Sequence, residues 1–236
     1  GHGDVVVTHI MMSARAFATA AVRRCRVVAT IDGAPVVINN LARFYYHARP
    51  LEGPSTRDGG HGDLTGFRVW ESASELIAHL DANRMLVEDR SVLELGAGTG
   101  SVGLAAAAMG AKHVVLTDVD STVTVAGDEG WEERGRLDTL LENIEMNGER
   151  ASAVSVAALR WGNAGHAAAI SARWPHGFDT IVASDTLYSP RMYDSLAATI
   201  LGLAAADAVA VLAFPMRHGE ERSFIEECLA PAFESV

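Results

Sequence analysis

Cysteine is scarce in this chain of 236 residues, which contains two. Cys25 and Cys228 are too few for a disulfide framework or a cysteine-bound zinc ion, so a reducing compartment is expected. The histidines show no metal-ligand spacing with one another or with carboxylates, and no bound metal is expected. No apolar run reaches the ~20 residues that a membrane-spanning helix needs, and no membrane partner is expected.

Basic residues are also outnumbered, because 19 Lys and Arg face 30 Asp and Glu and give a net charge of −11. A non-specific nucleic-acid binder is therefore not expected, since neutralising phosphates needs clustered basic side chains. The acidic charge is compatible with basic peptides or lysine-bearing proteins as partners. With 49% hydrophobic residues, the composition is that of a globular protein long enough to bury a full core.

The low cysteine content favours a cytoplasmic location, and a nuclear one is equally compatible. Residues 11–31 contain four arginines and no acidic residue, which also fits an organelle transit segment. A basic surface helix followed by a strand explains the same residues.

The most informative segment is VLELGAGTG, residues 92–100, where a buried-type strand runs into three alternating glycines. Gly96, Gly98 and Gly100 permit a tight turn and the close approach of a ligand, which a Cβ would block. The helix expected next directs its free N–H groups and positive dipole end at that ligand. The following strand, HVVLTD, ends in Asp118, which is placed to accept hydrogen bonds from a ribose. These features predict a nucleoside-cofactor site.

The glycine pattern alone does not identify the nucleoside. Residues 98–103 also match the dinucleotide fingerprint GxGxxG, which by itself is a weak signal. Glu94, however, lies two residues before the first glycine and is expected where a pyrophosphate would sit, so two negative groups would repel. A cofactor with an ammonium, a sulfonium and no phosphate suits this acid better. S-adenosylmethionine is therefore the expected cofactor, and a dinucleotide is the alternative.

From residue 70 onward helical and strand patterns alternate, which predicts a Rossmann-like, doubly wound, mainly parallel α/β sheet. Strands are expected near residues 91–95, 113–118, 154–158, 178–184 and 207–214. Residues 26–38 instead predict a β-hairpin around Asp32-Gly33, and residues 49–66 a mobile loop rich in Gly and Pro. We therefore expect an N-terminal extension over residues 1–65 and a main domain over residues 66–236.

One helix is expected before Asn147-Gly148, which would end it. Leu137, Leu140, Leu141 and Ile144 have the spacing of its buried face. Ligands of such sheets bind at the carboxyl ends of the strands, which directs attention to the residues that follow each strand.

Five segments, in order, carry a resemblance to a known family. They are GFRVWESA (66–73), VLELGAGTGSVGLAAA (92–107), VVLTDVD (114–120), LLENIEMNG with LRWG (140–148 and 159–162), and FDTIVASDTLYSP (178–190). The chain resembles the seven-β-strand S-adenosylmethionine-dependent methyltransferases. More narrowly, it resembles the protein-lysine methyltransferases marked by a DxxY motif, a family also described as nicotinamide N-methyltransferase-like. The match spans residues 66–217.

The glycine motif and this resemblance together imply which residues bind the cofactor. Trp70 would contact its methionine end, Asp118 its ribose hydroxyls and Trp161 its adenine. The full expected set is Trp70, Glu94, Gly96, Ala97, Gly98, Gly100, Asp118, Trp161 and Ser184. Glu94 is expected to orient either the loop or the amine of the cofactor rather than to transfer protons.

Asp185 and Tyr188 are the D and Y of DxxY, and the resemblance places them at the mouth where an acceptor amine arrives. Free lysine has a pKa near 10.4, and its amine must be neutral to attack. The carboxylate of Asp185 would bind the ammonium and accept its proton, and Tyr188 would line a narrow channel. Arg217 is expected to be a solvated arginine.

The resemblance implies methyl transfer to a lysine side chain of a protein substrate. Alternatives are a small-molecule N-methyltransferase, a non-catalytic S-adenosylmethionine-binding protein and an NAD-dependent oxidoreductase. The acidic charge and the lack of an Asn-Pro-Pro-Tyr-like motif argue against methylation of DNA or RNA. The target protein stays unidentified and the oligomeric state open, with a monomer favoured.

Three features depart from the family pattern. Residues 120–136 form an insert near the ribose edge, which is expected either to contact substrate or to be a surface loop. The chain ends where a seventh strand is expected to begin, so that strand would be short or missing. The N-terminal hairpin is expected to help choose the substrate.

Overall fold

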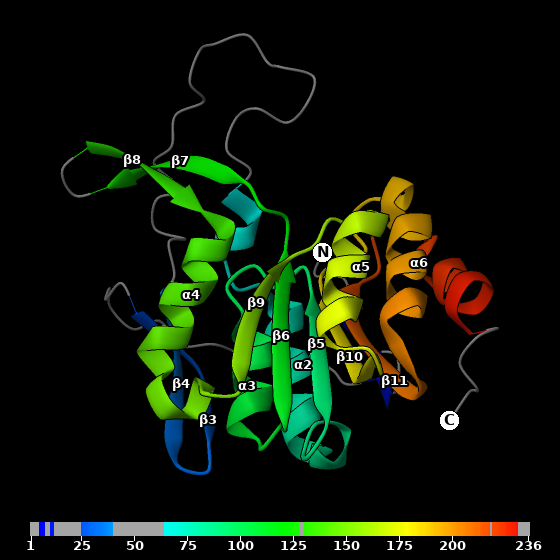
Figure 1. Cartoon of the computed structure of the whole chain (residues 1–236), viewed down its shortest axis with the longest axis horizontal. Coiled ribbons are helices and arrows are strands. Elements are labelled where there is room, and N and C mark those ends of the chain that lie inside the picture. Colours follow the sequence, from blue (N-terminus) through cyan, green and yellow to red (C-terminus); the bar gives the residue numbers. More distant parts are fainter. Residues whose placement is uncertain are drawn as a thin grey trace, which may run out of the picture.

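The computed structural model describes residues 5–7, 10–11, 25–39, 64–127, 130–217 and 219–230. The predicted mobile loop lies outside the described residues, except for its last three residues, 64–66. Most of the transit-like segment and residues 231–236 also lie outside them. Within the described residues, two layers of helices enclose a central sheet (Figure 1). No helix in this part of the chain is long and apolar enough to cross a membrane.

Five parallel strands form the centre of the sheet, in the order β9-β6-β5-β10-β11. They are β5 (Ser91–Leu95), β6 (His113–Asp118), β9 (Val154–Ala158), β10 (Phe178–Ser184) and β11 (Ala204–Pro215). All five predicted strands and the doubly wound α/β fold are confirmed. The order reverses between β5 and β10, which is where such sheets bind their ligands.

Two further short strands extend the sheet from the N-terminal segment. β1 (Val5–Val7) pairs antiparallel with β11, and β2 (Ile10–Met11) pairs antiparallel with β1. The sequence pattern had not predicted them. The parallel core is thus confirmed for five strands, and the other two strands of this sheet within the described residues come from the start of the chain.

Helices cover both faces of the sheet (Figure 1). α2 (Glu71–Ala82), α3 (Ser101–Ala108) and α4 (Arg136–Asn147) lie on one face, and α5 (Ala164–Arg173) and α6 (Tyr193–Leu203) on the other. Short helical turns are η1 (Leu64–Phe67), η2 (Arg84–Leu86), η3 (Gly148–Ala151) and η4 (Pro190–Met192). After β11 follow α7 (Glu221–Ser223) and η5 (Phe224–Leu229).

The sheet divides the hydrophobic core in two, because successive strand residues point to opposite faces. Val92 and Val182 pack under α2, α3 and α4, whereas Leu93 and Ile181 pack against α5 and α6. Strands buried on both faces read as continuous apolar runs. This explains why the sequence located these strands well.

The predicted hairpin is confirmed as β3 (Cys25–Ile31) and β4 (Ala34–Asn39), paired antiparallel. Its turn residues Asp32 and Gly33 have φ of 51° and 78°, as a type I′ turn requires. Ile31, Val36 and Ile38 are buried in the same core as α2, α3 and α4. The hairpin therefore shares the core of the main domain.

Hydrogen bonds from the end of α4 and from η3 hold this hairpin against the main domain. Asn147 accepts a hydrogen bond from the Val37 N–H at 3.0 Å and donates one to the Val37 carbonyl at 2.6 Å. Arg150 donates to the carbonyls of Ile31 and Ala34 at 3.0 and 3.1 Å. The Asn147 amide thus takes the place of a neighbouring strand at the edge of the hairpin.

The expected buried face of α4 is wrong at one position. Leu140 is buried, but Leu141 is 54% exposed. The buried face instead includes Thr139 and Asn143, whose side-chain amide donates to the Thr99 carbonyl at 2.8 Å. A count of apolar residues misses this face because part of what it buries is polar and hydrogen-bonded.

Replacing Asn147 by Ala should destabilise the protein by about 1–3 kcal/mol, because the N–H and carbonyl of Val37 lose their partner. Leu141→Ala, on the exposed side of the same helix, should change stability by less than about 0.5 kcal/mol. Chemical unfolding of the two variants tests this. Equal stabilities would show that Asn147 does not hold the hairpin.

Candidate functional site

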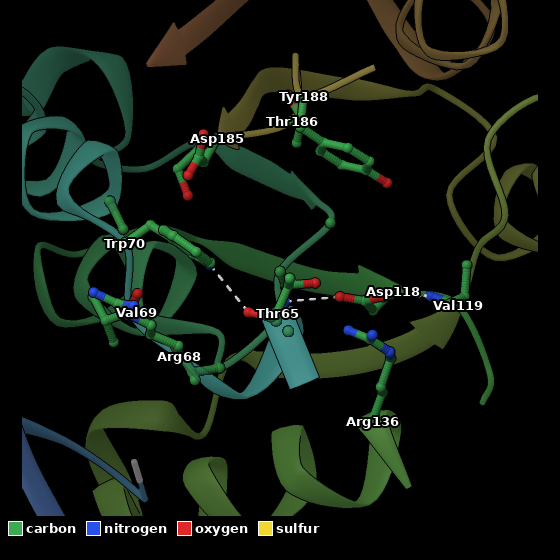
Figure 2. Close-up of a pocket in the computed structure, with 18 of the residues that line it drawn as sticks. Thr65, Arg68, Val69, Trp70, Asp118, Val119, Arg136, Asp185, Thr186 and Tyr188 are labelled. Carbon is green, nitrogen blue, oxygen red and sulfur yellow. Dashed lines mark hydrogen bonds between the residues drawn. The ribbon is translucent and has the colours of Figure 1, made fainter. Parts of the chain in front are cut away.

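A cavity of about 810 Å³ opens at the carboxyl ends of the parallel strands. Its lining comes from the segments that follow β5, β6, β9, β10 and β11, and from η1 and the start of α2. Figure 2 shows Asp185 and Trp70 on one side of this space and Asp118, Val119 and Arg136 on the other. The predicted location of the site, at the strand ends beside the reversal of strand order, agrees with this cavity.

The glycine loop after β5 forms part of the cavity wall through Gly96, Ala97 and Gly98. Gly98 has a φ of 55°, and a Cβ there would lie 2.9 Å from the carbonyl oxygen of Gly66. The position needs glycine because η1 packs directly on the loop. The missing Cβ of Gly98 therefore allows η1, rather than a ligand, to approach the loop closely.

Gly100 lies behind the loop and does not line the cavity. Its φ is 73°, and a Cβ there would lie 2.8 Å from a methyl of Leu116 and 2.9 Å from one of Leu140. Gly100 is thus a packing requirement at the start of α3. Because Gly100 does not line the cavity, it is not placed to contact a ligand there.

Glu94 does not face the cavity either, contrary to the expectation that its acid meets the cofactor. Its side chain is 1% exposed, and Oε2 accepts a hydrogen bond from the Gly103 N–H at 2.8 Å, at the N-terminal end of α3. Burial raises the pKa of Glu94 to about 8, against the lowering effect of this N–H. Repulsion by Glu94 is therefore no argument against a pyrophosphate.

The position of Glu94 gives a different argument against a dinucleotide. A pyrophosphate in such folds binds to the free N–H groups at the helix N-terminus. The carboxyl group of Glu94 already occupies this end of α3 through the Gly103 N–H. The structure therefore favours a cofactor without phosphate.

Asp118 lies at the end of β6 and lines the cavity. Its Oδ2 accepts a hydrogen bond from the Gly98 N–H at 2.8 Å, and its Oδ1 accepts one from the Val119 N–H at 2.7 Å. A carboxylate oxygen can accept more than one hydrogen bond, which is the property that binding a ribose hydroxyl requires. Asp118 fixes the glycine loop, and its binding of a ribose stays a prediction.

Trp70, at the start of α2, lines the cavity as expected from the sequence. Its indole N–H donates to the Thr65 carbonyl at 3.0 Å, and the Arg68 guanidinium lies 4.7 Å from the ring centre (Figure 2). Trp161 and Ser184 also line the cavity. Their contacts with a cofactor stay predictions.

Asp185 and Tyr188 open onto the same cavity as the glycine loop. Asp185 directly follows β10 and has a φ of 56°, while its N–H donates to the Ala213 carbonyl at 2.8 Å. Tyr188 is 57% exposed, and its ring centre lies 6.4 Å from that of Trp161. The structure thus brings the DxxY pair together with seven of the nine expected cofactor residues, all but Glu94 and Gly100.

Arg217 is not the solvated arginine that the sequence predicted. Its Nη1 lies 2.6 Å from Oδ1 of Asp185. The sequence could not show this pair, because Asp185 and Arg217 are 32 positions apart along the chain. They meet because each follows one of two adjacent parallel strands, β10 and β11.

Arg136 is a further cavity residue that the sequence analysis missed. It is the buried first residue of α4, and its Nε donates to Ser121 Oγ at 3.1 Å. Its guanidinium lies 5.6 Å from the Phe67 ring centre. No motif marked this position, since it is the last residue of the insert that departs from the family pattern.

The cavity is more basic than the chain as a whole. Four arginines and two aspartates line it, in contrast to a net charge of −11 for the whole sequence. They are Arg68, Arg136, Arg160, Arg217, Asp118 and Asp185. The total charge is therefore a poor guide to what this site attracts.

The insert forms a second hairpin, β7 (Thr122–Gly127) and β8 (Gly130–Gly135), which projects beyond one end of α4 (Figure 1). The Arg136 N–H donates to the Ser121 carbonyl at 3.0 Å and closes its base. Within the described residues, neither this hairpin nor the β3–β4 hairpin contributes to the cavity lining. The described residues hold no group of three or more side chains that could bind a metal.

Comparison with known proteins gives a consistent family. A family profile described as lysine methyltransferase matches residues 57–230. Protein N-lysine methyltransferase METTL21A of Xenopus tropicalis is 31% identical over 160 residues, which cover 67% of this chain and 64% of that protein. EEF1A lysine methyltransferase 3 of Mus musculus is 28% identical over 159 residues, 66% of this chain and 60% of that protein. The chain thus spans less than two thirds of the length of these relatives.

Among solved structures, a Pyrococcus horikoshii protein provisionally described as an RNA methyltransferase superposes with a TM-score of 0.46. It is 20% identical and covers 68% of this chain and 67% of that chain. A similarity this low has no bearing on function.

Gly98→Ala should separate packing at the loop from backbone strain. Gly148, with the same φ of 55° and no atom within 4 Å of an added Cβ, provides the matched control. Both variants should lose at least about 1 kcal/mol of stability, because a positive φ is unfavourable with a Cβ, and at Gly98 the added Cβ would also lie 2.9 Å from the carbonyl oxygen of Gly66. Only Gly98→Ala should weaken S-adenosylmethionine binding by about tenfold or more in calorimetry. Equal affinities would show that the contact with η1 does not shape the site.

Glu94 makes a pH-dependent contribution to stability. Folding raises the pKa of the Glu94 carboxyl from 4.5 to about 8, so the folded protein favours the protonated carboxyl. The stability gained in this way is fully present below the unfolded pKa of 4.5. That contribution should be lost as the pH rises from about 4.5 through 8. Glu94→Gln keeps an oxygen that can accept the hydrogen bond from the Gly103 N–H. In this variant the melting temperature should depend less on pH over this range. A variant that melts with the same pH dependence as the native protein would refute this.

Proposed function

The chain belongs to the lysine methyltransferase family, and on this premise we propose that it transfers a methyl group from S-adenosylmethionine to a lysine side chain of a protein substrate. One observation carries the proposal. Asp185 and Tyr188 open onto the same cavity as Gly96, Gly98 and Asp118. A single space can therefore hold a nucleoside cofactor at one side and an amine at the other.

The cavity fits this cofactor. Its volume of about 810 Å³ is within the usual range for ligand sites. The backbone of Gly96 and Gly98 presents no side chain, Trp70 and Trp161 offer aromatic surface, and Asp118 offers acceptors for hydroxyl groups. S-adenosylmethionine supplies an electrophilic methyl group on a sulfonium. The proposed cofactor contacts rest on these residues and not on Glu94.

The task of the protein is to position a neutral amine in line with that methyl group. The carboxylate of Asp185 would bind the arriving ammonium by a charge-assisted hydrogen bond and accept the proton that it must lose. Tyr188, at the exposed end of the cavity, would line the path of the lysine chain. An exposed mouth of this kind favours a side chain on a protein over an enclosed small molecule.

Labelling with methyl-labelled S-adenosylmethionine in a cell lysate tests the proposal. The native protein should label a discrete protein band at lysine, and Asp185→Asn should lower the rate about 100-fold or more, as loss of a general base does. Asp207→Asn, an exposed change near the amino end of β11, is the matched control and should label as the native protein does.

Self-labelling is easy to recognise, because the chain contains a single lysine, Lys112. Label at lysine that persists with Lys112→Arg cannot come from the protein itself. Label confined to small molecules would favour a small-molecule N-methyltransferase. Cofactor binding without any label in lysate would favour a non-catalytic S-adenosylmethionine-binding protein.

A further inference from the structure

The carboxylate of Asp185 is held on one side only. Its side chain is 10% exposed, and its buried Oδ1 lies 2.6 Å from Nη1 of Arg217. The two side chains form an ion pair, but the angles at these atoms are not those of a hydrogen bond. Asp185 nevertheless lines the cavity, so the carboxylate bridges between Arg217 and the space where an amine would bind.

The backbone of Asp185 is fixed in an unusual conformation. Its φ of 56° lies in the left-handed region, which residues with a Cβ adopt infrequently and which Asp tolerates better than most. Here the Asp185 N–H donates to the Ala213 carbonyl of β11 at 2.8 Å. With the main chain fixed in this way, rotation of the side chain alone decides where the carboxylate points.

Arg217 is fixed by the same sheet edge. It follows β11, which pairs in parallel with β10, the strand before Asp185. Its backbone N–H donates to Oε1 of Glu221 at 2.8 Å, and Glu221 is fully buried at the start of α7. The Arg217 main chain is therefore anchored from the far side. Its partly exposed side chain reaches back from this anchor to Asp185.

We propose that Arg217 is a positioning residue for Asp185. It takes one carboxylate oxygen and so presents the other to the acceptor amine, with Glu221 as the anchor of Arg217. The inference rests on the proposed function, because it concerns the same amine site. It adds that the acid of the DxxY motif works as half of an ion pair. The positive charge of Arg217 also offsets the cost of a carboxylate that is largely removed from water.

A double-mutant cycle tests the inference. Arg217→Met keeps an unbranched apolar side chain and removes the charge, and it should lower kcat for the labelled protein about tenfold or more. The affinity for S-adenosylmethionine should not change, because Arg217 acts on the amine side. Arg217→Lys keeps a cation and should recover most of the rate. In an Asp185→Asn background, Arg217→Met should have no further effect on kcat, since coupled residues are not additive.

Arg191→Met is the matched control, because Arg191 is exposed on η4 and does not line the cavity. It should retain the native rate. An Arg217→Met rate equal to that of this control would overturn the inference. A rise in kcat/KM for the protein substrate would also overturn it, because Arg217 would then compete with lysine for Asp185.

Chemical unfolding separates failure of this inference from failure of the proposed function. The stability changes of Arg217→Met and Asp185→Asn should be less than additive in the double variant if the ion pair exists in solution. If the native protein labels no protein, the proposed function and the positioning role fail together, and the unfolding cycle still reports the pair. Additive stability changes would contradict the pair whatever the activity.

Discussion

The hydrogen bond from the Gly98 N–H to Asp118 is the contact on which the site depends. It joins the loop after β5 to the end of β6, so that two adjacent strands share one binding edge. Behind the loop, Glu94 binds the start of α3 and Asn143 binds the Thr99 carbonyl. In front of it, η1 packs against Gly98. The loop is thus held on three sides by the protein itself, and a ligand would meet a preformed surface.

Electrostatics at the site differ from those of the whole chain. A surplus of acidic residues over the full sequence coexists with a cavity lined by more arginines than aspartates. Coulomb interactions weaken rapidly with distance and salt, so the nearest charges decide what binds in the cavity. The pairing of Asp185 with Arg217 makes the same point on a smaller scale. The chemistry of an acid depends on its neighbour as well as on its own identity.

Much of the fold could be predicted from the sequence. The five parallel strands, the hairpin turn at Asp32-Gly33 and the end of α4 at Gly148 follow from local patterns of apolar, turn and capping residues. The motifs also led to a cavity that contains Trp70, Asp118 and Asp185. Predictions failed where the direction of a side chain depends on how helices, strands and loops pack against one another, as for Glu94, Leu141 and Arg217.

The sequence by itself determined the five parallel strands, the β3–β4 hairpin, the α/β class and the family, because strand burial, turn geometry and short motifs are properties of consecutive residues. Only the tertiary structure decided that Glu94 turns to α3, that Asn143 replaces Leu141 on the buried face of α4, and that Arg217 reaches Asp185. These outcomes depend on which strands lie side by side and on how closely a helix approaches a loop. The direction of each of these side chains is set by three-dimensional packing between elements, and the local periodicity of the sequence contains no information about that packing.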